Sequence, residues 1–140
     1  MMIWYIGYPE YIYNNIFSEK NSWNAYVACL LNSDGIETEI IAYIMLQLNR
    51  SERSSFIQGL YVEEEYRKRG IAKKLINEAE NYSKTMGCKH INAEMLGHLS
   101  SFYNKLGYSI HTKITDHKYI ISKDLEKTNN IKKHDEGWDR

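Results

Sequence analysis

The sequence lacks the features of a secreted or metal-binding protein. It has two cysteines, Cys29 and Cys88, which do not form a C-x-x-C motif. We interpret both as buried, reduced thiols in strand-like segments, which favours a cytoplasmic location. None of the five histidines has a partner at H-x-x-x-H or H-E-x-x-H spacing. No metal site is therefore predicted.

Long apolar runs and an excess of one charge are also absent. No apolar stretch approaches the roughly 20 residues of a membrane helix, and the start Met1–Tyr5 lacks the cationic region of a secretion signal. Lys plus Arg number 18 and Asp plus Glu number 18, so the formal net charge is zero. Long-range electrostatics therefore favours neither nucleic acid nor an anionic membrane as a partner.

Proline is almost absent from a chain whose 140 residues suit a single domain. Pro9, the only proline, separates a short predicted strand from a weak helix around Glu10–Ile16. Aromatic residues crowd the stretch Ile3–Phe17. We interpret them as core or dimer packing, so a homodimer is one expected assembly. We place the domain at residues 1–127 and a polar tail at residues 128–140.

Several segments have the composition of strands. Residues 23–32 and 38–48 are β-rich, and the turn signal Asn32–Gly35 between them predicts a hairpin. A polar turn then leads to a strand at residues 56–62. Further strands are predicted where residues alternate, at 89–95, and near the end of the chain, at 108–114 and 119–122.

A long amphipathic helix is predicted between the strands at 56–62 and 89–95. Its apolar residues recur at helical spacing and share one face: Ile71, Leu75, Ile76, Ala79, Tyr82 and Met86. Gly87 stands where a C-terminal cap is expected. Strands interrupted by helices predict an α+β domain with helices layered on a mixed sheet.

A cationic turn, Arg67–Lys73, joins the strand at 56–62 to this helix. The first N–H groups of a helix have no intrahelical partner, and the helix dipole adds positive charge there. Gly70 lets the backbone approach a ligand closely. The Walker and G-x-G-x-x-G patterns are both absent, because the turn has a single glycine. We expect this turn to bind a pyrophosphate, although basic turns before helices are also common as solvated features.

Two segments resemble the signatures of the GNAT superfamily of acetyl-CoA-dependent N-acetyltransferases. The pattern Arg67-x-x-Gly70-x-Ala72 resembles the family's pyrophosphate-binding motif, and Ser100–Tyr108 resembles its FYxKxGF/Y segment. The resemblance covers about Ala25 to Leu125. It implies a GNAT-like α+β fold: a mixed, mostly antiparallel twisted sheet flanked by helices. The N-terminal helical region is expected to be short, because residues 10–22 have room for about one helix.

The resemblance also implies which residues bind acetyl-CoA, the acyl donor. The strand edge before the motif should hold the pantetheine chain, the motif should hold the pyrophosphate, and a tyrosine should lie near the sulfur. The implied cofactor-binding residues are Leu60, Tyr61, Val62, Arg67, Lys68, Arg69, Gly70, Ile71, Ala72, Lys73 and Tyr103.

The implied reaction is direct attack of a primary amine on the acetyl-CoA thioester. Tyr103 is then the candidate acid for the departing thiolate, with packing on a short helix as the alternative. The strand positions where relatives carry a catalytic carboxylate hold Phe56 and Gln58. Glu94 and His98 remain as candidate bases, and solvent is a third option. The alternative function is a non-catalytic acyl-CoA-binding or regulatory module. The acceptor amine, on a small molecule or a protein, is not predicted.

Overall fold

The computed structural model describes residues 4–7 and 23–126. The weak helix predicted around residues 10–16 and the tail predicted at 128–140 lie outside these residues. The strands are β1 (Trp4–Gly7), β2 (Trp23–Leu31), β3 (Glu37–Asn49), β4 (Ser54–Val62), β5 (His90–Leu96), β6 (Ser109–Lys113) and β7 (Lys118–Asp124). The helices are α2 (Ile71–Thr85), α3 (Ser100–Lys105) and the short 3₁₀ segments η2 (Glu64–Tyr66) and η3 (Gly97–Leu99).

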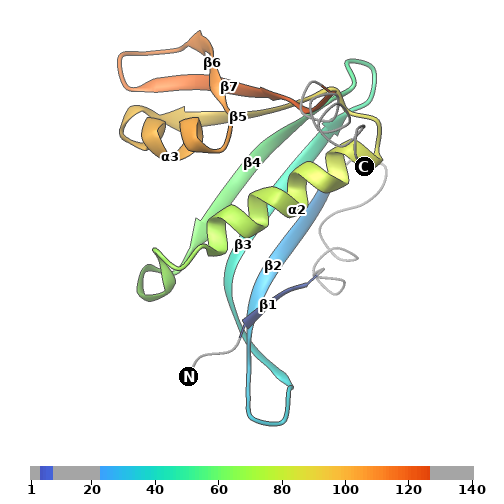
Figure 1. Ribbon diagram of the computed structural model, residues 1–140, viewed down its shortest axis with the longest axis vertical. Coiled ribbons are helices and arrows are strands. Elements are labelled where there is room, and N and C mark those ends of the chain that lie inside the picture. Colours follow the sequence, from blue (N-terminus) through green and yellow to red (C-terminus); the bar gives the residue numbers. More distant parts are fainter. Residues whose placement is uncertain (1–3, 8–22, 127–140) are drawn as a thin grey trace, which may run out of the picture.

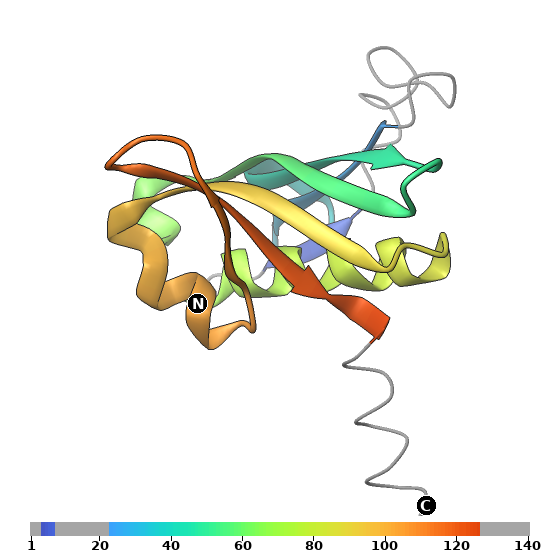
Figure 2. The ribbon, with the colours of Figure 1, turned by 90° about the horizontal axis from the view of Figure 1, so that it is seen from above.

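The strands form one mixed, seven-stranded sheet in the order β1-β2-β3-β4-β5-β7-β6. All neighbouring pairs are antiparallel except β4 and β5, which are parallel. Helix α2 runs across one face of the sheet, and α3 lies on the same side (Figures 1 and 2). This arrangement confirms the α+β fold class predicted from the sequence.

The β2–β3 hairpin closes through the predicted turn at Asn32–Gly35. The Asn32 side-chain oxygen accepts hydrogen bonds from the backbone N–H groups of Asp34 (2.9 Å) and Ile36 (3.0 Å). Gly35 has a φ of 79°, which a residue with a side chain rarely adopts. The turn chemistry in the sequence therefore sets this connection.

The sheet opens between its two parallel strands. β4 pairs with β5 over only four positions, from Ser54 with His90 to Ile57 with Ala93. Beyond Ile57 the strands diverge, and β5 continues along β7. A β-bulge occurs at this point, since Ile57 pairs with Leu46 and Gly59 pairs with Met45, which leaves Gln58 as the extra residue. The β4 edge from residue 58 onward is therefore not paired with β5, and the divergence is visible in Figure 1.

The core lies between the sheet and α2. Ile71, Leu75, Ile76 and Ala79 are at most 1 % exposed, which confirms the predicted apolar face. Across from them are buried strand residues that include Ile44, Leu46, Ile91, Ala93, Met95 and Ile121. Burying each large aliphatic side chain contributes about 1.5–3 kcal/mol. This packing holds α2, and with it the cationic turn, at a defined place over the sheet.

The C-terminal end of α2 differs from the prediction in detail. Met86 is 37 % exposed, because the helix ends there and Gly87 reverses the chain with a φ of 84°. Cys88, which we expected in a strand, lies in the connection before β5, and its N–H donates to the Ser83 carbonyl. Cys29 is buried in β2, and both thiols are free. Burial raises the pKa of both thiols.

Candidate active site

The turn before α2 presents a set of unpaired backbone N–H groups. Lys68 and Gly70 both have positive φ, 65° and 83°. Gly70 is the N-cap of α2 and offers no side-chain cap. The N–H groups of the first helical turn are therefore available to a ligand. Alternating backbone conformations of this kind make concave anion-binding nests.

Gly70 has open space around it in the protein. A Cβ built at this residue meets no atom within 4 Å. Glycine is therefore favoured here by its left-handed backbone, and not by crowding from neighbouring protein atoms.

Two arginines fix the shape of this turn. The Arg67 Nε donates to the Val62 carbonyl at 2.8 Å, and its guanidinium lies 5.7 Å from the Tyr61 ring centroid. The Arg69 guanidinium donates to the Glu65 carbonyl at 3.1 Å and lies 5.5 Å from the centre of the Tyr66 ring. Both side chains thus tie the turn back to β4 and η2.

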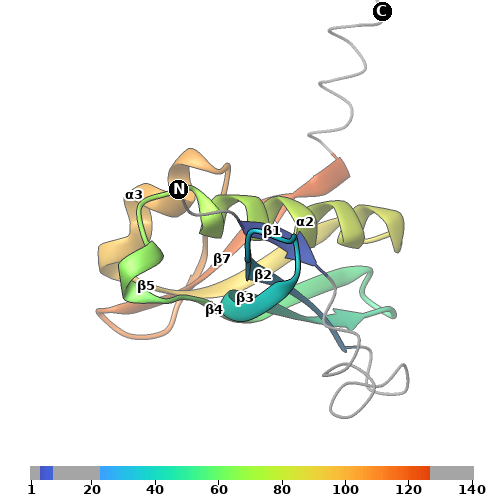
Figure 3. The same ribbon diagram turned by 90° about the horizontal axis from the view of Figure 1, so that it is seen from below.

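A pocket of about 520 Å³ lies between β4, the N-terminal end of α2 and α3. Figure 3 shows these elements close together. The residues that line it are Leu60, Tyr61, Val62, Tyr66, Arg67, Lys68, Gly70, Ile71, Ala72, Lys73, Leu99, Phe102 and Tyr103. The pocket is thus formed by the β4 edge that is not paired with β5 and by the unpaired N–H groups of α2.

The structure brings together nearly all of the residues predicted to bind the cofactor. Arg69 is the exception, since its guanidinium is held against η2 and does not line the pocket. Three further lining residues, Tyr66, Leu99 and Phe102, were not predicted from the sequence. Phe102 stands in the FYxKxGF/Y segment, so the motif itself carried a signal for it. Leu99 and Tyr66 become neighbours of the pocket only through the fold.

Tyr103 is 6 % exposed and lies at the end of this pocket. No hydrogen bond joins its hydroxyl to any other residue in the described part of the chain. Burial raises the pKa of the Tyr103 hydroxyl above its usual range. The group is therefore protonated at neutral pH and is able to donate to a ligand atom in the pocket.

Behind Tyr103 lies a buried polar cluster. The Glu80 carboxylate, on α2, accepts a hydrogen bond from the Tyr108 hydroxyl (2.8 Å) and another from the Lys123 ammonium (3.0 Å). Burial and the Glu80 charge raise the pKa of Tyr108 far above its ordinary value. The cluster joins α2, the connection between α3 and β6, and β7. Sequence periodicity gave no sign of it, because Glu80 is a charged residue buried beside the apolar residues of α2.

The structure places the two candidate bases outside this pocket. Glu94 is exposed on β5, and its carboxylate forms an ion pair with Lys118 at 3.4 Å. His98 is exposed in η3. Neither residue lines the pocket that contains Tyr103. On β4, the Gln58 amide donates to Gln47 at 3.0 Å.

The chain belongs to the GNAT acetyltransferase family, whose model matches residues 2–108. Members of this family transfer acetyl groups from acetyl-CoA, and the protein belongs to that class of acyltransferase. No curated protein matches the sequence significantly.

Solved structures with the same fold include other members of the class. The PaiA N-acetyltransferase of Thermoplasma acidophilum, in complex with coenzyme A, is 18 % identical with a TM-score of 0.65, covering 88 % of this chain and 99 % of that one. A chimera of the spermidine N-acetyltransferase SpeG of Vibrio cholerae and hSSAT is 20 % identical with a TM-score of 0.64, covering 86 % and 77 %. An IAA acetyltransferase of Bacillus cereus is 17 % identical with a TM-score of 0.63, covering 87 % and 99 %. At these identities the likeness shows the shared fold.

Two further observations concern the described residues. None of their helices has both the length and the apolar character needed to cross a membrane. Within residues 4–7 and 23–126, no group of three or more His, Cys, Asp and Glu side chains is placed to hold a metal ion.

Proposed function

We propose that this protein is a cytoplasmic N-acetyltransferase that moves the acetyl group of acetyl-CoA to a primary amine of a small molecule or protein. The observation that carries this proposal is the pocket of about 520 Å³. It combines an open strand edge, a helix N-terminus and the Tyr103 hydroxyl, which has no hydrogen bond to any described residue. These parts match the successive chemical groups of acetyl-CoA.

The pyrophosphate is held at the N-terminus of α2. The N–H groups of Ile71, Ala72 and Lys73 point out of the helix there, and the helix dipole favours negative charge. Lys68 and Lys73 line the same pocket, and neither forms an ion pair with another described residue. Their charge is therefore available to phosphate oxygens.

The pantetheine arm lies along the β4 edge at Leu60–Val62, where β5 has turned away. An extended chain bearing amides can pair with such an edge much as a neighbouring strand would. This places the thioester near the β-bulge at Gln58. Leu99 and Phe102 supply apolar contacts on the opposite side of the pocket.

The reaction proceeds by direct attack. The nitrogen of the neutral amine forms a bond to the thioester carbon, and backbone N–H groups at the β4 edge stabilise the tetrahedral oxyanion. Collapse breaks the C–S bond, the sulfur takes the Tyr103 proton, and CoA leaves as the thiol. The nitrogen loses its extra proton to water, and the Tyr103 hydroxyl regains a proton from solvent.

Solvent takes the amine proton in this scheme because no carboxylate occupies the β4 positions near the thioester. Phe56 and Gln58 stand there, and Glu94 is already paired with Lys118. Glu94 and His98 remain the alternatives for this role. Catalysis then rests mainly on holding amine and thioester in a reactive geometry.

The test is thiol release from acetyl-CoA in the presence of a panel of primary amines, with calorimetric measurement of acetyl-CoA binding on the same preparation. Amine-dependent thiol release, together with an acetylated product seen by mass spectrometry, would support the proposal. The missing carboxylate on β4 favours one second candidate, a non-catalytic acyl-CoA-binding module. Tight acetyl-CoA binding without turnover of any amine would select that candidate.

A further inference from the structure

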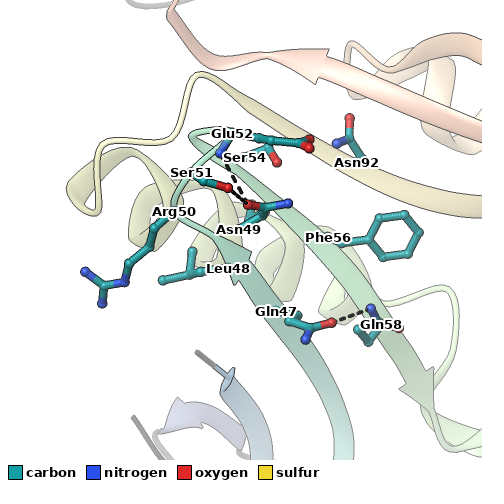
Figure 4. Close-up of a pocket in the computed structure, with 11 residues that line it drawn as sticks. Gln47, Leu48, Asn49, Arg50, Ser51, Glu52, Ser54, Phe56, Gln58 and Asn92 are labelled. Carbon is teal, nitrogen blue, oxygen red and sulfur yellow. Dashed lines mark hydrogen bonds between the residues drawn. The ribbon is translucent and has the colours of Figure 1, made fainter. Parts of the chain in front are cut away.

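A second pocket, of about 510 Å³, lies on the opposite face of the sheet. Ser55 lies on the face of the sheet that α2 covers, because its hydroxyl contacts the Ser83 hydroxyl of α2 at 2.7 Å. Side chains alternate along a strand, so Ser54 and Phe56 face away from α2. Figure 4 shows the lining side chains of this second pocket. They are Gln47, Leu48, Asn49, Arg50, Ser51, Glu52, Ser54, Ser55, Phe56, Gln58 and Asn92.

The two pockets are lined by different residues of β4, on either side of its bulge. Phe56 and Gln58 line the second pocket, and Leu60–Val62 line the first. The bulge and the end of the β4–β5 pairing both fall at residues 57–59. A molecule in the second pocket can therefore reach the place where we put the thioester, through the opening between the diverging strands.

The second pocket is polar, and its charged lining residues are Glu52 and Arg50. Glu52 is its only lining carboxylate, and it forms no ion pair with another described residue. Figure 4 shows the Glu52 carboxylate directed toward Asn92, whereas the Arg50 guanidinium points away from the other lining side chains. The aromatic ring of Phe56 faces the same space, and such a ring also attracts cations.

The turn that carries Glu52 is held in place by Asn49. The Asn49 side-chain oxygen accepts hydrogen bonds from the Ser51 hydroxyl (2.9 Å) and from the Glu52 backbone N–H (3.2 Å). At the other end, the Gln58 amide is fixed by its hydrogen bond to Gln47. Glu52 and Gln58 thus mark the two ends of the second pocket, and part of β4 runs between them. The segment from Ser54 to Gln58 spans roughly 13 Å at the usual rise of a strand.

We infer that this second pocket binds the acceptor, and that the acceptor is an aliphatic amine carrying a second cationic group. This inference rests on the proposed function. The distal ammonium lies between the Glu52 carboxylate and the Asn92 amide, and the chain passes over Phe56. The reacting amine is then next to Gln58 and the thioester. An acceptor with an anionic group in place of the distal cation would face the Glu52 charge and bind poorly.

The experiment measures kcat/KM of the full chain for α,ω-diaminoalkanes of increasing length, each paired with the n-alkylamine of equal length. We expect diamines of the best length to exceed their monoamine partners by about 10-fold or more, the scale of one charge-assisted hydrogen bond. Glu52→Gln should reduce this preference to within about 2-fold by raising KM for the diamine. Acetyl-CoA affinity should be unchanged. The matched control is Glu39→Gln, an exposed carboxylate on β3 at the far end of the β2–β3 hairpin.

Several results would overturn the assignment. Equal kcat/KM for diamines and monoamines in the unmodified protein would do so, and so would equal loss for both classes in Glu52→Gln. A preference for anionic amines would also exclude it. Direct calorimetry with a diamine in the presence of CoA separates this inference from the proposed function. Binding that Glu52→Gln weakens, without turnover of any amine, supports the pocket and refutes the transferase activity. Turnover of amines without a preference for diamines supports the transferase activity and refutes the assignment of the second pocket.

Discussion

The rings of Tyr103 and Tyr108 meet edge to face, with centroids 5.6 Å apart and planes at 75°. Tyr108 is in turn held by its hydrogen bond to Glu80, which Lys123 also contacts. Phe102 packs against the other side of the Tyr103 ring at 5.1 Å. The orientation of the Tyr103 hydroxyl in the pocket between β4, α2 and α3 thus depends on a buried cluster that reaches from α2 to β7.

Replacing Tyr108 by phenylalanine tests the energetic importance of this cluster. The change removes the hydroxyl donor and leaves the buried Glu80 carboxylate with one hydrogen bond fewer. We expect the free energy of unfolding to fall by about 1–3 kcal/mol. The control is Tyr119→Phe, which removes an exposed hydroxyl contact to the Asp116 carbonyl and should change stability by less than about 0.5 kcal/mol. Chemical denaturation measures both. Equal effects would show that the Glu80 hydrogen bond contributes nothing.

Gly70→Asp tests the pyrophosphate site. The substitution places a side chain and a negative charge at the N-terminus of α2, beside the N–H groups that we propose receive the phosphates. We expect acetyl-CoA binding to be lost in calorimetry, with the fold retained. Gly35→Asp is the matched control, because Gly35 also has positive φ and open space around it but lies in the β2–β3 turn. If Gly70→Asp binds acetyl-CoA as tightly as the control, the turn is only a solvated helix start.

Tyr103→Phe tests the proposed acid. The pocket shape is preserved, because only the hydroxyl is removed, and this hydroxyl has no hydrogen bond to a described residue. We expect acetyl-CoA affinity to remain within about 2-fold and kcat to fall by about 10²-fold, the scale of a lost proton-transfer group. Steady-state kinetics and calorimetry on the same variant measure the two quantities. Parallel losses of binding and rate would assign Tyr103 to packing instead.

The pH dependence of the rate should follow the acceptor amine. A free amine is the nucleophile, and an alkylamine has an ordinary pKa of about 10.4, so the rate should rise as pH increases from 7 to 9. Burial raises the pKa of Tyr103 above about 10. The Tyr103 hydroxyl therefore stays protonated through this range, so its deprotonation should cause no fall in rate between pH 7 and 9.

Variants of the two candidate bases complete the pH experiment. If solvent removes the proton, His98→Ala and Glu94→Gln should both keep the rising limb and lose less than about 3-fold in kcat. Disappearance of the limb in only one variant would identify that residue as the base. The pH–rate profiles of the unmodified protein and both variants should be measured with one acceptor, since a second amine would shift the limb by its own pKa.

Local patterns in the sequence determined most of the secondary structure. The turn at Asn32–Gly35, the apolar stripe of α2 and the alternation of β5 each depend on neighbours in the chain, so their physical causes are visible in a linear reading. The cationic turn could be predicted for a similar reason, because a helix N-terminus and positive φ at Gly70 are local properties. The family resemblance added the prediction that Tyr103 lies near the cofactor sulfur.

Only the tertiary structure decided which of these residues share a space. Arg67 and Arg69 lie two residues apart in the same turn. The Arg69 guanidinium is held against η2 and the Arg67 guanidinium lies by the pocket, because each meets a different carbonyl and ring. The second pocket joins Gln47 of β3, Glu52 of the β3–β4 turn and Asn92 of β5. The Glu80 cluster joins residues from α2, the connection between α3 and β6, and β7. These contacts depend on strand order, on the bulge at Gln58 and on the divergence of β4 from β5, which arise from packing between distant parts of the chain.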